Sequence, residues 1–344
     1  MSAPAGRARS LSVVVPVYRS RGTLNELHRR LENVLVPLVH DFEIVFVEDC
    51  GGDGSWETIR ELVETHARVR GIRLSRNYGQ HNALLCGIRA ARFDIVVTLD
   101  DDLQNPPEEI PRLLRKLDEG YDVVYGTPER EQHGLFRNLA SQVTKFVLQN
   151  AMGASIARRV SAFRAFRTHL RNAFVNYHGP YVSIDVLLTW GTTRFAYVVV
   201  AHDPRTVGAS NYTMRKLITH ALNMVTGFST GPLQLASIIG FSFTLVGFLA
   251  LAYVLGVYFV NGGSVPGFAF LASMIAIFAG AQLFALGIIG EYLSRMHFRS
   301  MDRPPYVVLD EAMADARAAG SQQDAVISPS KSAAGGPAGY ASGP

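Results

Sequence analysis

Three consecutive carboxylates, Asp100, Asp101 and Asp102, follow an uncharged run from Ile95 to Leu99. A short apolar run of this kind is typical of a buried strand, so the triplet is predicted to lie at a strand's carboxyl end. Because side chains alternate along an extended chain, we expect Asp100 and Asp102 to share one side and Asp101 to point away. A hard divalent cation with oxygen ligands relieves the repulsion between two such carboxylates and commonly brings substrate phosphates with it. The alternative is a solvated acidic turn that caps the next helix, but the position at a strand end favours the metal.

A second acidic loop, Glu48 to Ser55, follows the predicted strand Glu43 to Val47. In open α/β sheets, ligands bind at the carboxyl ends of the strands. Both acidic loops are predicted to lie at such ends. We therefore expect them to form one site.

The elements that must position these loops alternate between strand and helix over residues 11 to 125. Strands are predicted at 11–17, 43–47, 69–74, 95–99 and 122–125, and helices at 23–35, 56–66, 82–91 and 106–119. The first helix begins with a capping box, Thr23 and Glu26, and Ser55 can cap the second. Apolar strands that alternate with helices indicate a parallel doubly wound α/β sheet.

Composition limits the class of protein. Charged residues are 18% of the chain, and the formal net charge of +4 does not indicate nucleic-acid binding. The two cysteines, Cys50 and Cys86, form no disulfide framework and fit a reduced, cytosol-facing domain. Near the N-terminus, the apolar run from Leu11 to Tyr18 contains Pro16 and is too short for a signal peptide.

The charge deficit is concentrated in residues 217–290, which contain no Asp, Glu, Lys or Arg. Within this stretch, 235–260 and 268–289 each exceed the roughly 20 residues that cross a bilayer. They predict a transmembrane hairpin whose two ends face the cytoplasm, because basic residues flank it and its outer turn carries no charge. A buried helical hairpin of a soluble protein is the alternative, but neither segment has an amphipathic face. The flanking basic residues are Arg215, Lys216, Arg295, Arg299 and Arg303.

The remaining segments complete the expected domain organisation. Residues 1–10 form an N-terminal tail, and 11–212 form the cytoplasmic domain. Segment 135–148 has an apolar face and fits either an interfacial helix or an ordinary helix packed on the core. Segment 213–231 fits an amphipathic juxtamembrane helix. Residues 290–310 are expected to be cytoplasmic, and 311–344, rich in Ala, Gly, Ser and Pro, to be a disordered tail.

The glycine motifs of two common nucleotide-binding folds are absent. Pro16-Val17-Tyr18-Arg19-Ser20 stands where a Rossmann fold has Gly-x-Gly-x-x-Gly, and no P-loop pattern occurs. The sheet instead offers carboxylates. One at the end of the second strand can accept the N3–H of uracil or the ribose hydroxyls, and a metal at Asp100 and Asp102 can neutralise a diphosphate leaving group.

Several motifs, taken in order, resemble those of family 2 glycosyltransferases with the GT-A fold, and in particular the polyprenyl-phosphate sugar transferases. The similarity covers roughly residues 10–308 and includes the apolar hairpin. The motifs are Val15–Tyr18, Val47–Asp49 with Asp53–Ser55, Leu74–Gly79, Leu99–Glu109, Arg205–Tyr212 and Gly290–Tyr292. The resemblance implies a doubly wound GT-A sheet followed by interfacial helices and a two-helix transmembrane hairpin.

The resemblance also implies residue roles. Asp49 would bind the nucleotide base or ribose, with Pro16 and Tyr18 in the same pocket. Asp100 and Asp102 would hold Mg²⁺ or Mn²⁺ against the diphosphate. Arg205 would grip a phosphate, and Arg164 occupies the arginine of the family's Asp-Phe-Arg motif. The further substrate-binding candidates are Glu48, Asp101, Ser210, Tyr212 and Lys216.

The chain departs from the family pattern at several positions. Glu48 replaces the first residue of an Asp-Asp pair, and Cys50 begins an altered loop. Ala162 stands where many relatives carry Asp, and Asp185 is a candidate substitute for that carboxylate. An acceptor phosphate monoester, with a second pKa of about 6, is already anionic at neutral pH and needs no general base.

The predicted activity is an inverting transfer of a sugar from a nucleotide-diphosphate donor, a UDP-sugar, to polyprenyl (undecaprenyl) phosphate at the cytoplasmic membrane face. The resemblance also implies a homo-oligomer, which in relatives is often a tetramer. One alternative is a processive polysaccharide synthase, but neither Trp56 nor Trp190 lies in a Gln-x-x-Arg-Trp motif. A second alternative is a non-catalytic membrane scaffold that binds nucleotide, and Cys50 and Ala162 motivate it.

Overall fold

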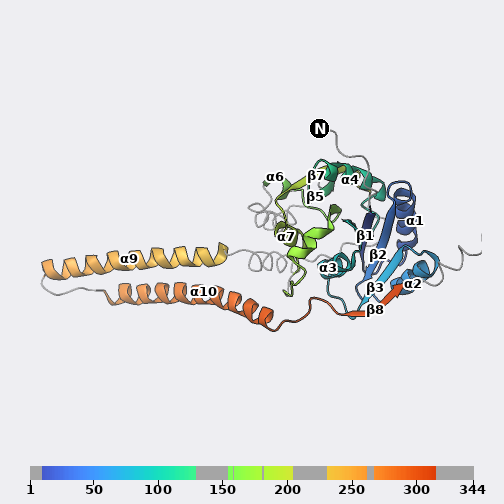
Figure 1. Cartoon of the computed structure of the whole chain (residues 1–344). Coiled ribbons are helices and arrows are strands. Elements are labelled where there is room, and N and C mark those ends of the chain that lie inside the picture. Colours follow the sequence, from blue (N-terminus) through green and yellow to red (C-terminus); the bar gives the residue numbers. More distant parts are fainter. Residues whose placement is uncertain are drawn as a thin grey trace, which may run out of the picture.

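A computed structural model of the chain describes residues 10–128, 154–157, 159–179, 182–203, 231–261 and 267–314. It consists of an α/β domain and two long helices that run side by side away from it (Figure 1). The strands are β1 Ser10–Val17, β2 Asp41–Glu48, β3 Val69–Leu74, β4 Ile95–Thr98, β5 Val123–Pro128, β6 Arg164–Arg167, β7 Phe195–Val200 and β8 Val308–Met313. The helices are α1 Leu24–Leu35, α2 Ser55–Thr65, α3 Gln80–Ala90, α4 Ile110–Asp118, α6 Ala154–Ala157, α7 Ile184–Thr189, α9 Gly231–Asn261 and α10 Phe268–Ser300, with 3-10 turns η1 Pro107–Glu109 and η2 Thr168–Ala173.

The described strands form one mixed sheet in the order β7-β5-β6-β4-β1-β2-β3-β8. The central strands β4, β1, β2 and β3 are parallel, as the alternation of strand and helix predicts. Two antiparallel strands complete the sheet: β6 lies between β4 and β5, and β8 pairs with β3 at the edge. The sheet is therefore a doubly wound α/β sheet whose parallel centre was predicted and whose antiparallel strands were not.

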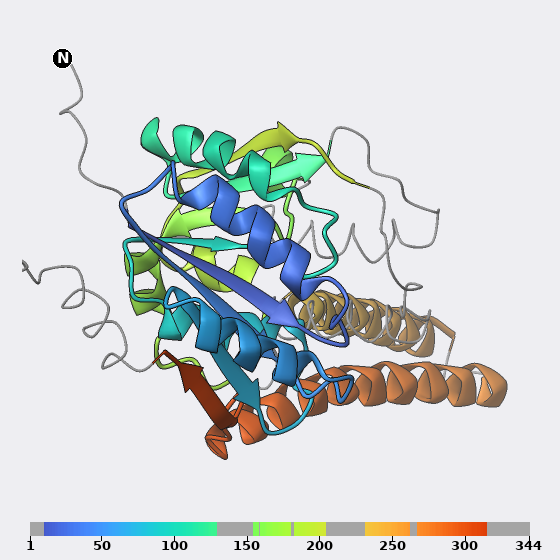
Figure 2. The ribbon, with the colours of Figure 1, turned by 90° about the vertical axis from the view of Figure 1, so that its right-hand side faces the viewer.

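Hydrophobic residues cover both faces of the sheet. Alternate residues of β1 belong to different cores: Val13 and Val15 pack with α1, α2 and α4, whereas Val14 packs with α3 and α7. The helices thus form a layer on each side of the sheet, and Figure 2 shows the domain after a 90° turn from the view of Figure 1. This burial on both faces explains why β1, β2 and β4 are almost continuously apolar.

Three local expectations differ from the structure. Ser55 does not cap α2: it is the first residue of that helix, and its hydroxyl donates to the Asp53 carboxylate at 2.6 Å. Thr23 does not form the predicted capping box; its hydroxyl donates to the Ser20 carbonyl at 3.0 Å instead. The tail was expected from residue 311, but residues 311–313 belong to β8, because the edge of β3 supplies backbone partners for them. The structure does not describe residues 135–148 or 213–230, so the interfacial helices predicted there lie outside its described part.

The helices α9 and α10 occupy the two predicted hairpin segments. Each contains a stretch long and apolar enough to cross a membrane, and none of either stretch is buried against the protein. They contact each other, for example where the rings of Phe243 and Phe278 meet edge to face at 5.7 Å. Large apolar side chains such as Phe241 and Tyr253 remain exposed, which is not the pattern of a core hairpin.

Candidate active site

A cavity of about 360 Å³ opens at the carboxyl ends of the four central parallel strands. Each strand is followed by a loop that supplies part of the lining. The lining residues are Pro16, Val17 and Tyr18 from β1 and its loop, Asp49 after β2, Asn77, Gly79 and Gln80 between β3 and α3, and Asp100, Asp101 and Asp102 after β4. The structure thus brings the two predicted acidic loops to one cavity.

The aspartate triplet lies in a turn rather than in the strand. Because β4 ends at Thr98, the strand alternation that was expected to turn Asp101 away does not apply, and all three aspartates line the cavity. Asp100 accepts a hydrogen bond from the Gln80 side-chain amide at 2.6 Å. Asp102 accepts one from the backbone N–H of Gln104 at 3.2 Å.

Asp101 links the triplet to the β1 loop. Its carboxylate accepts a hydrogen bond from the backbone N–H of Tyr18 at 3.0 Å. Burial raises the pKa of Asp101 to about 6, against the opposing effect of hydrogen bonds from Ser20 and Tyr18. The loop that carries Asp101 is therefore held against the loop that carries Tyr18.

Asp49 fixes the loop between β3 and α3. Its side chain is 3% exposed, and its two oxygens accept the backbone N–H groups of Tyr78 at 2.7 Å and Gly79 at 2.8 Å. Burial raises the pKa of Asp49, and these two hydrogen bonds oppose the rise. A carboxylate oxygen has two lone pairs, so each oxygen can accept a second hydrogen bond from the cavity side.

Glu48 lies behind the cavity rather than in it. The carboxylate is buried, accepts the Gly51 N–H at 2.5 Å and lies 3.3 Å from the Arg73 guanidinium. Gly51 itself approaches the β1 loop so closely that a Cβ there would lie 2.7 Å from the Arg19 backbone nitrogen. The buried Glu48 carboxylate therefore stabilises the altered loop after β2 through its hydrogen bond with Gly51.

Backbone strain is concentrated around this cavity. In the described residues, the non-glycine residues with left-handed φ are Arg19, Cys50, Leu103 and Asp302. The first three lie in the loops after β1, β2 and β4, with φ of 57°, 55° and 63°. A non-glycine residue in this conformation is held there by its surroundings, and such residues cluster at ligand sites.

Arg164 is placed elsewhere. It is 2% exposed and forms an ion pair with Asp185 inside the domain. Tyr125 donates to the same Asp185 oxygen at 3.1 Å, and burial raises the pKa of this tyrosine. Arg164 and Asp185 therefore bind each other, and neither residue lines the cavity.

The other predicted site residues lie outside the described part of the chain. They are Arg205, Ser210, Tyr212 and Lys216. The sequence analysis assigned no role to four residues that line the cavity, namely Val17, Asn77, Gly79 and Gln80. The first three lie in the motifs Val15–Tyr18 and Leu74–Gly79, which carry the family resemblance but gave these residues no function.

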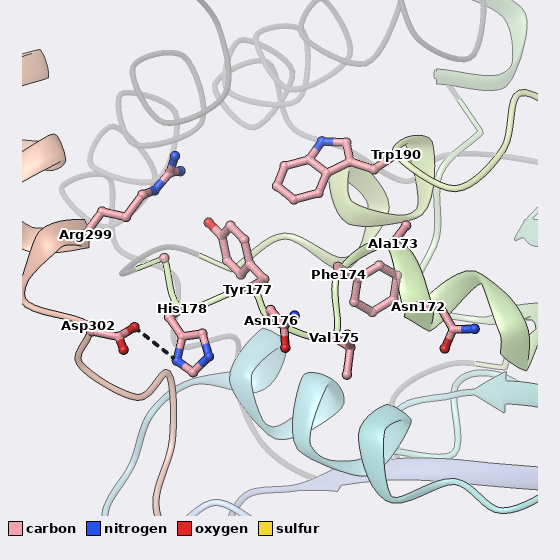
Figure 3. Close-up of a pocket in the computed structure, with 11 residues that line it drawn as sticks. Asn172, Ala173, Phe174, Val175, Asn176, Tyr177, His178, Trp190, Arg299 and Asp302 are labelled. Carbon is pink, nitrogen blue, oxygen red and sulfur yellow. Dashed lines mark ion pairs between the residues drawn. The ribbon is translucent and has the colours of Figure 1, made fainter.

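A second cavity, of about 390 Å³, lies where the end of α10 meets the domain (Figure 3). Tyr177, His178 and Trp190 line it from the domain, and Arg299 and Asp302 from the end of α10 and the turn after it. His178 lies 3.6 Å from Asp302. None of the predicted site residues that the structure describes lines this cavity, which lies between the domain and the end of α10.

The doubly wound sheet, with a carboxylate-lined cavity at the carboxyl ends of its parallel strands, fits the GT-A class of glycosyltransferases. Residues 12–174 match the family model described as glycosyl transferase family 2. The chain is 36% identical over 303 residues to the undecaprenyl-phosphate 4-deoxy-4-formamido-L-arabinose transferase of Klebsiella pneumoniae (strain 342), covering 87% of this chain and 93% of that relative. It is 36% identical over 307 residues to the protein of the same name from Serratia proteamaculans (strain 568), with the same coverage.

The chain belongs to glycosyl transferase family 2 and is a glycosyltransferase. Among solved structures, it is similar to glucosyl-3-phosphoglycerate synthase from Mycobacterium tuberculosis, a complex with Mn²⁺, UDP and phosphoglyceric acid. That match has a TM-score of 0.48 and 20% identity and covers 63% of this chain and 76% of that one. The family match and the two relatives, together with the doubly wound sheet, confirm the expectations of a GT-A fold, of this family and of an enzyme.

Proposed function

We propose that this protein transfers a sugar from a nucleoside-diphosphate donor, a UDP-sugar, to the phosphate of a polyprenyl lipid at a membrane surface. The observation that carries the proposal is the cavity at the carboxyl edge of the sheet, where Asp49 and the Asp100–Asp102 triplet converge. The relatives named for transfer to undecaprenyl phosphate match the chain over both the sheet domain and the apolar helices. The product is a polyprenyl-phosphate sugar for modification of cell-envelope glycans.

The nucleoside end of the donor fits the side of the cavity formed by β1 and β2. Asp49 is held rigidly by two backbone N–H groups and retains acceptor capacity for a base N–H or a ribose hydroxyl. Tyr18, 41% exposed, offers an aromatic face beside Pro16 for the base. A rigid acceptor next to an aromatic surface orients a planar heterocycle at little entropic cost.

The diphosphate fits the side of the cavity formed by the aspartate triplet. Asp100 and Asp102 supply hard carboxylate oxygens, the donor type that Mg²⁺ and Mn²⁺ prefer, so these residues fit a divalent cation. When bound, such a cation supplies charge stabilisation for the departing diphosphate. Gln80 orients Asp100 through its amide, and the Asp101 contact with Tyr18 keeps the triplet next to the nucleoside side.

The chain needs no carboxylate at position 162 for this chemistry. Asp185, the candidate substitute, is committed to Arg164 and Tyr125 and lies away from the cavity lining. An acceptor phosphate oxygen carries no proton at neutral pH, so it attacks the anomeric carbon directly, with inversion, while the bond to the nucleoside diphosphate breaks. Positioning and leaving-group stabilisation provide the rate acceleration.

The acceptor lipid reaches the site from the membrane side. The α9–α10 hairpin supplies the apolar surface. Arg295 and Arg299 near the end of α10, and Arg303 just after it, suit an anionic headgroup layer. Arg205, Ser210, Tyr212 and Lys216 remain the candidates for gripping a phosphate. We also propose, from the family alone, a homo-oligomer in the membrane.

The decisive experiment replaces Asp102 with Asn in the full chain. Transfer of a labelled sugar from a UDP-sugar panel to undecaprenyl phosphate, read by lipid extraction and mass spectrometry, should fall at least about 100-fold. Asp94→Asn is the matched control, because Asp94 lies at the opposite end of the same strand and is exposed. Full activity of Asp102→Asn would contradict the metal assignment, and UDP binding without any lipid product would favour the scaffold alternative.

A further inference from the structure

Two histidines and a glutamate come together at the contact between α1 and the end of α2, and none of them lines the ligand cavity. His28 and Glu32 are one turn apart on α1 and therefore share a face of that helix. His66 is the residue at which α2 ends. The candidate ligand atoms of the three side chains all lie within 4.8 Å of one another.

His28 is buried at the contact between α1 and the end of α2. The residue is 4% exposed, and its ring lies beside the ring of His66 and near the carboxylate of Glu32. The two imidazoles and the carboxylate thus place three donor atoms close enough to bind one ion.

His66 is oriented as a metal ligand is. Its Nδ1 lies 3.2 Å from the Leu62 carbonyl oxygen and 2.8 Å from the Thr65 hydroxyl. An N–H at Nδ1 donated to a carbonyl oxygen leaves Nε2 with its lone pair, which is the arrangement that outer partners impose on metal-bound histidines. The His66 and His28 rings lie 4.1 Å apart between centroids.

We propose that His28, Glu32 and His66 form a binding site for a zinc-type divalent transition-metal ion. Two imidazoles and one carboxylate are the donors that Zn²⁺ prefers, with a water molecule left for the fourth position, whereas Mg²⁺ prefers oxygen ligands alone. Glu32 and His66 are partly exposed, so the ion has a path from solvent. This site differs in donors from the all-oxygen pair Asp100 and Asp102 and does not depend on the proposed transfer reaction.

The ion would join two helices that begin at the loops of the active-site cavity. α1 follows the loop that contains Tyr18 and Arg19, and α2 follows the loop that contains Asp49 and Cys50. A bond from α1 to the last turn of α2 stabilises the folded domain, because the three ligands are not held together in the unfolded chain. Zn²⁺ binding is therefore expected to raise the thermal unfolding temperature.

The test uses the untagged full chain in detergent, stripped of metal with a chelator. Titration with Zn²⁺ should show one saturable site in calorimetry, and a hundredfold excess over Kd should raise Tm by about 5 °C. Co²⁺ should give visible absorption bands of a four-coordinate nitrogen and oxygen site, which Zn²⁺ then abolishes. Millimolar Mg²⁺ should not compete.

The variants Glu32→Gln and His66→Gln should each weaken Zn²⁺ binding at least tenfold while leaving the metal-free Tm within about 2 °C. The controls are His40→Gln, which changes an exposed histidine next to Asp41, and Asp102→Asn, which removes a carboxylate of the active-site cavity. Both controls should keep the Zn²⁺ site. Absence of saturable binding, or binding that survives in both cluster variants, would overturn the proposal without bearing on sugar transfer.

Discussion

Burial decides what a charged side chain in this fold can do. Arg164 and Asp185 have the residue types of catalytic groups, yet they form a buried ion pair with Tyr125 next to it. Such a pair adds little net stability over an apolar replacement, but each partner makes the other indispensable. Glu48 behaves similarly, because its buried carboxylate holds Gly51 and Arg73 rather than a substrate. At the residue scale, then, the carboxylates that remain for the proposed reaction are those that line the cavity.

The Asp185→Asn variant tests this division. Asparagine keeps an acceptor oxygen for Arg164 and Tyr125 but removes the charge, so Arg164 is left buried and uncompensated. We expect a loss of about 3 kcal/mol in unfolding free energy, seen as a Tm lower by about 10 °C in thermal unfolding of the purified protein. Asp94→Asn, at an exposed position, should not change Tm.

Tm and the rate of sugar transfer, measured on the same variant, separate a structural role of Asp185 from a catalytic one. If Asp185 is structural, transfer by the variant at a temperature well below its Tm should stay within a few-fold of the original rate. An unchanged Tm together with loss of transfer would instead assign Asp185 to the reaction and would show that the ion pair opens during turnover.

At the scale of elements, close packing of α3 on the sheet positions Gln80. Gly87 lies where α3 crosses β1 and β2, and a Cβ there would lie 2.3 Å from a Val14 methyl and 3.0 Å from a Val47 methyl. The helix can approach the sheet this closely only because residue 87 has no side chain. The first residue of the same helix, Gln80, then donates to Asp100 at the cavity.

Gly87→Ala should therefore destabilise the protein, although alanine is the better helix former. The propensity gain is about 1 kcal/mol, whereas overpacking costs typically 1–3 kcal/mol and the two valines have no space to move within a buried core. The expected result is a lower Tm with reduced transfer, because α3 and Gln80 shift away from Asp100. Gly22→Ala is the control, since nothing lies within 4 Å of a Cβ at Gly22. An equal or higher Tm for Gly87→Ala would show that α3 moves freely on the sheet.

The elements that sequence reasoning located share one property: their pattern is local. The apolar strands β1, β2 and β4, and the helices between them, were predicted because burial on both faces leaves a continuous signal. β6 has arginine at both ends, and β8 contains Asp310 and Glu311, so neither carries that signal. Their strand conformation comes from backbone partners distant in the sequence.

The meeting of the two acidic loops at one cavity was also predictable from local patterns. Asp49 and Asp100–Asp102 were located because carboxylates at the ends of apolar strands must meet at one edge of a parallel sheet. The direction of Asp101 was wrong because it depended on where β4 stops, a boundary that a side-chain pattern does not fix. Gln80 was missed because its role depends on the distance between α3 and the sheet, which Gly87 sets.

At the scale of the whole molecule, β8 connects the apolar hairpin to the far edge of the sheet. The chain leaves α10 at Ser300 and enters β8 at Val308, which pairs antiparallel with β3 beside α2 (Figure 2). The Ser75 N–H also donates to the Val307 carbonyl at 2.9 Å. β8 thus attaches the end of α10 to the sheet and covers the edge of β3.

A chain that ends at residue 306 should lose this attachment. Exposure of the β3 edge is expected to lower Tm and promote self-association, which thermal unfolding and size-exclusion chromatography in detergent would detect. A chain that ends at residue 314 is the matched control, because it keeps all of β8. Identical behaviour of the two truncated chains would show that β8 contributes nothing to the stability of the sheet.

The orientation of the hairpin follows from charge placed at its ends. Arg295, Arg299 and Arg303 follow the apolar part of α10, whereas residues 261–267 between the two helices carry no charge. The positive-inside rule therefore predicts that the domain and both helix ends face the cytoplasm.

In intact bacteria, a membrane-impermeant maleimide should label a Ser264→Cys variant, built on Cys50→Ser, without permeabilisation. The exposed Cys50 of the original chain should react only after the inner membrane is opened, and Cys86 should stay unreactive because it is buried. Labelling of Cys50 in intact cells, with Ser264→Cys protected, would invert the topology and place the aspartate cavity on the side that lacks nucleotide sugars.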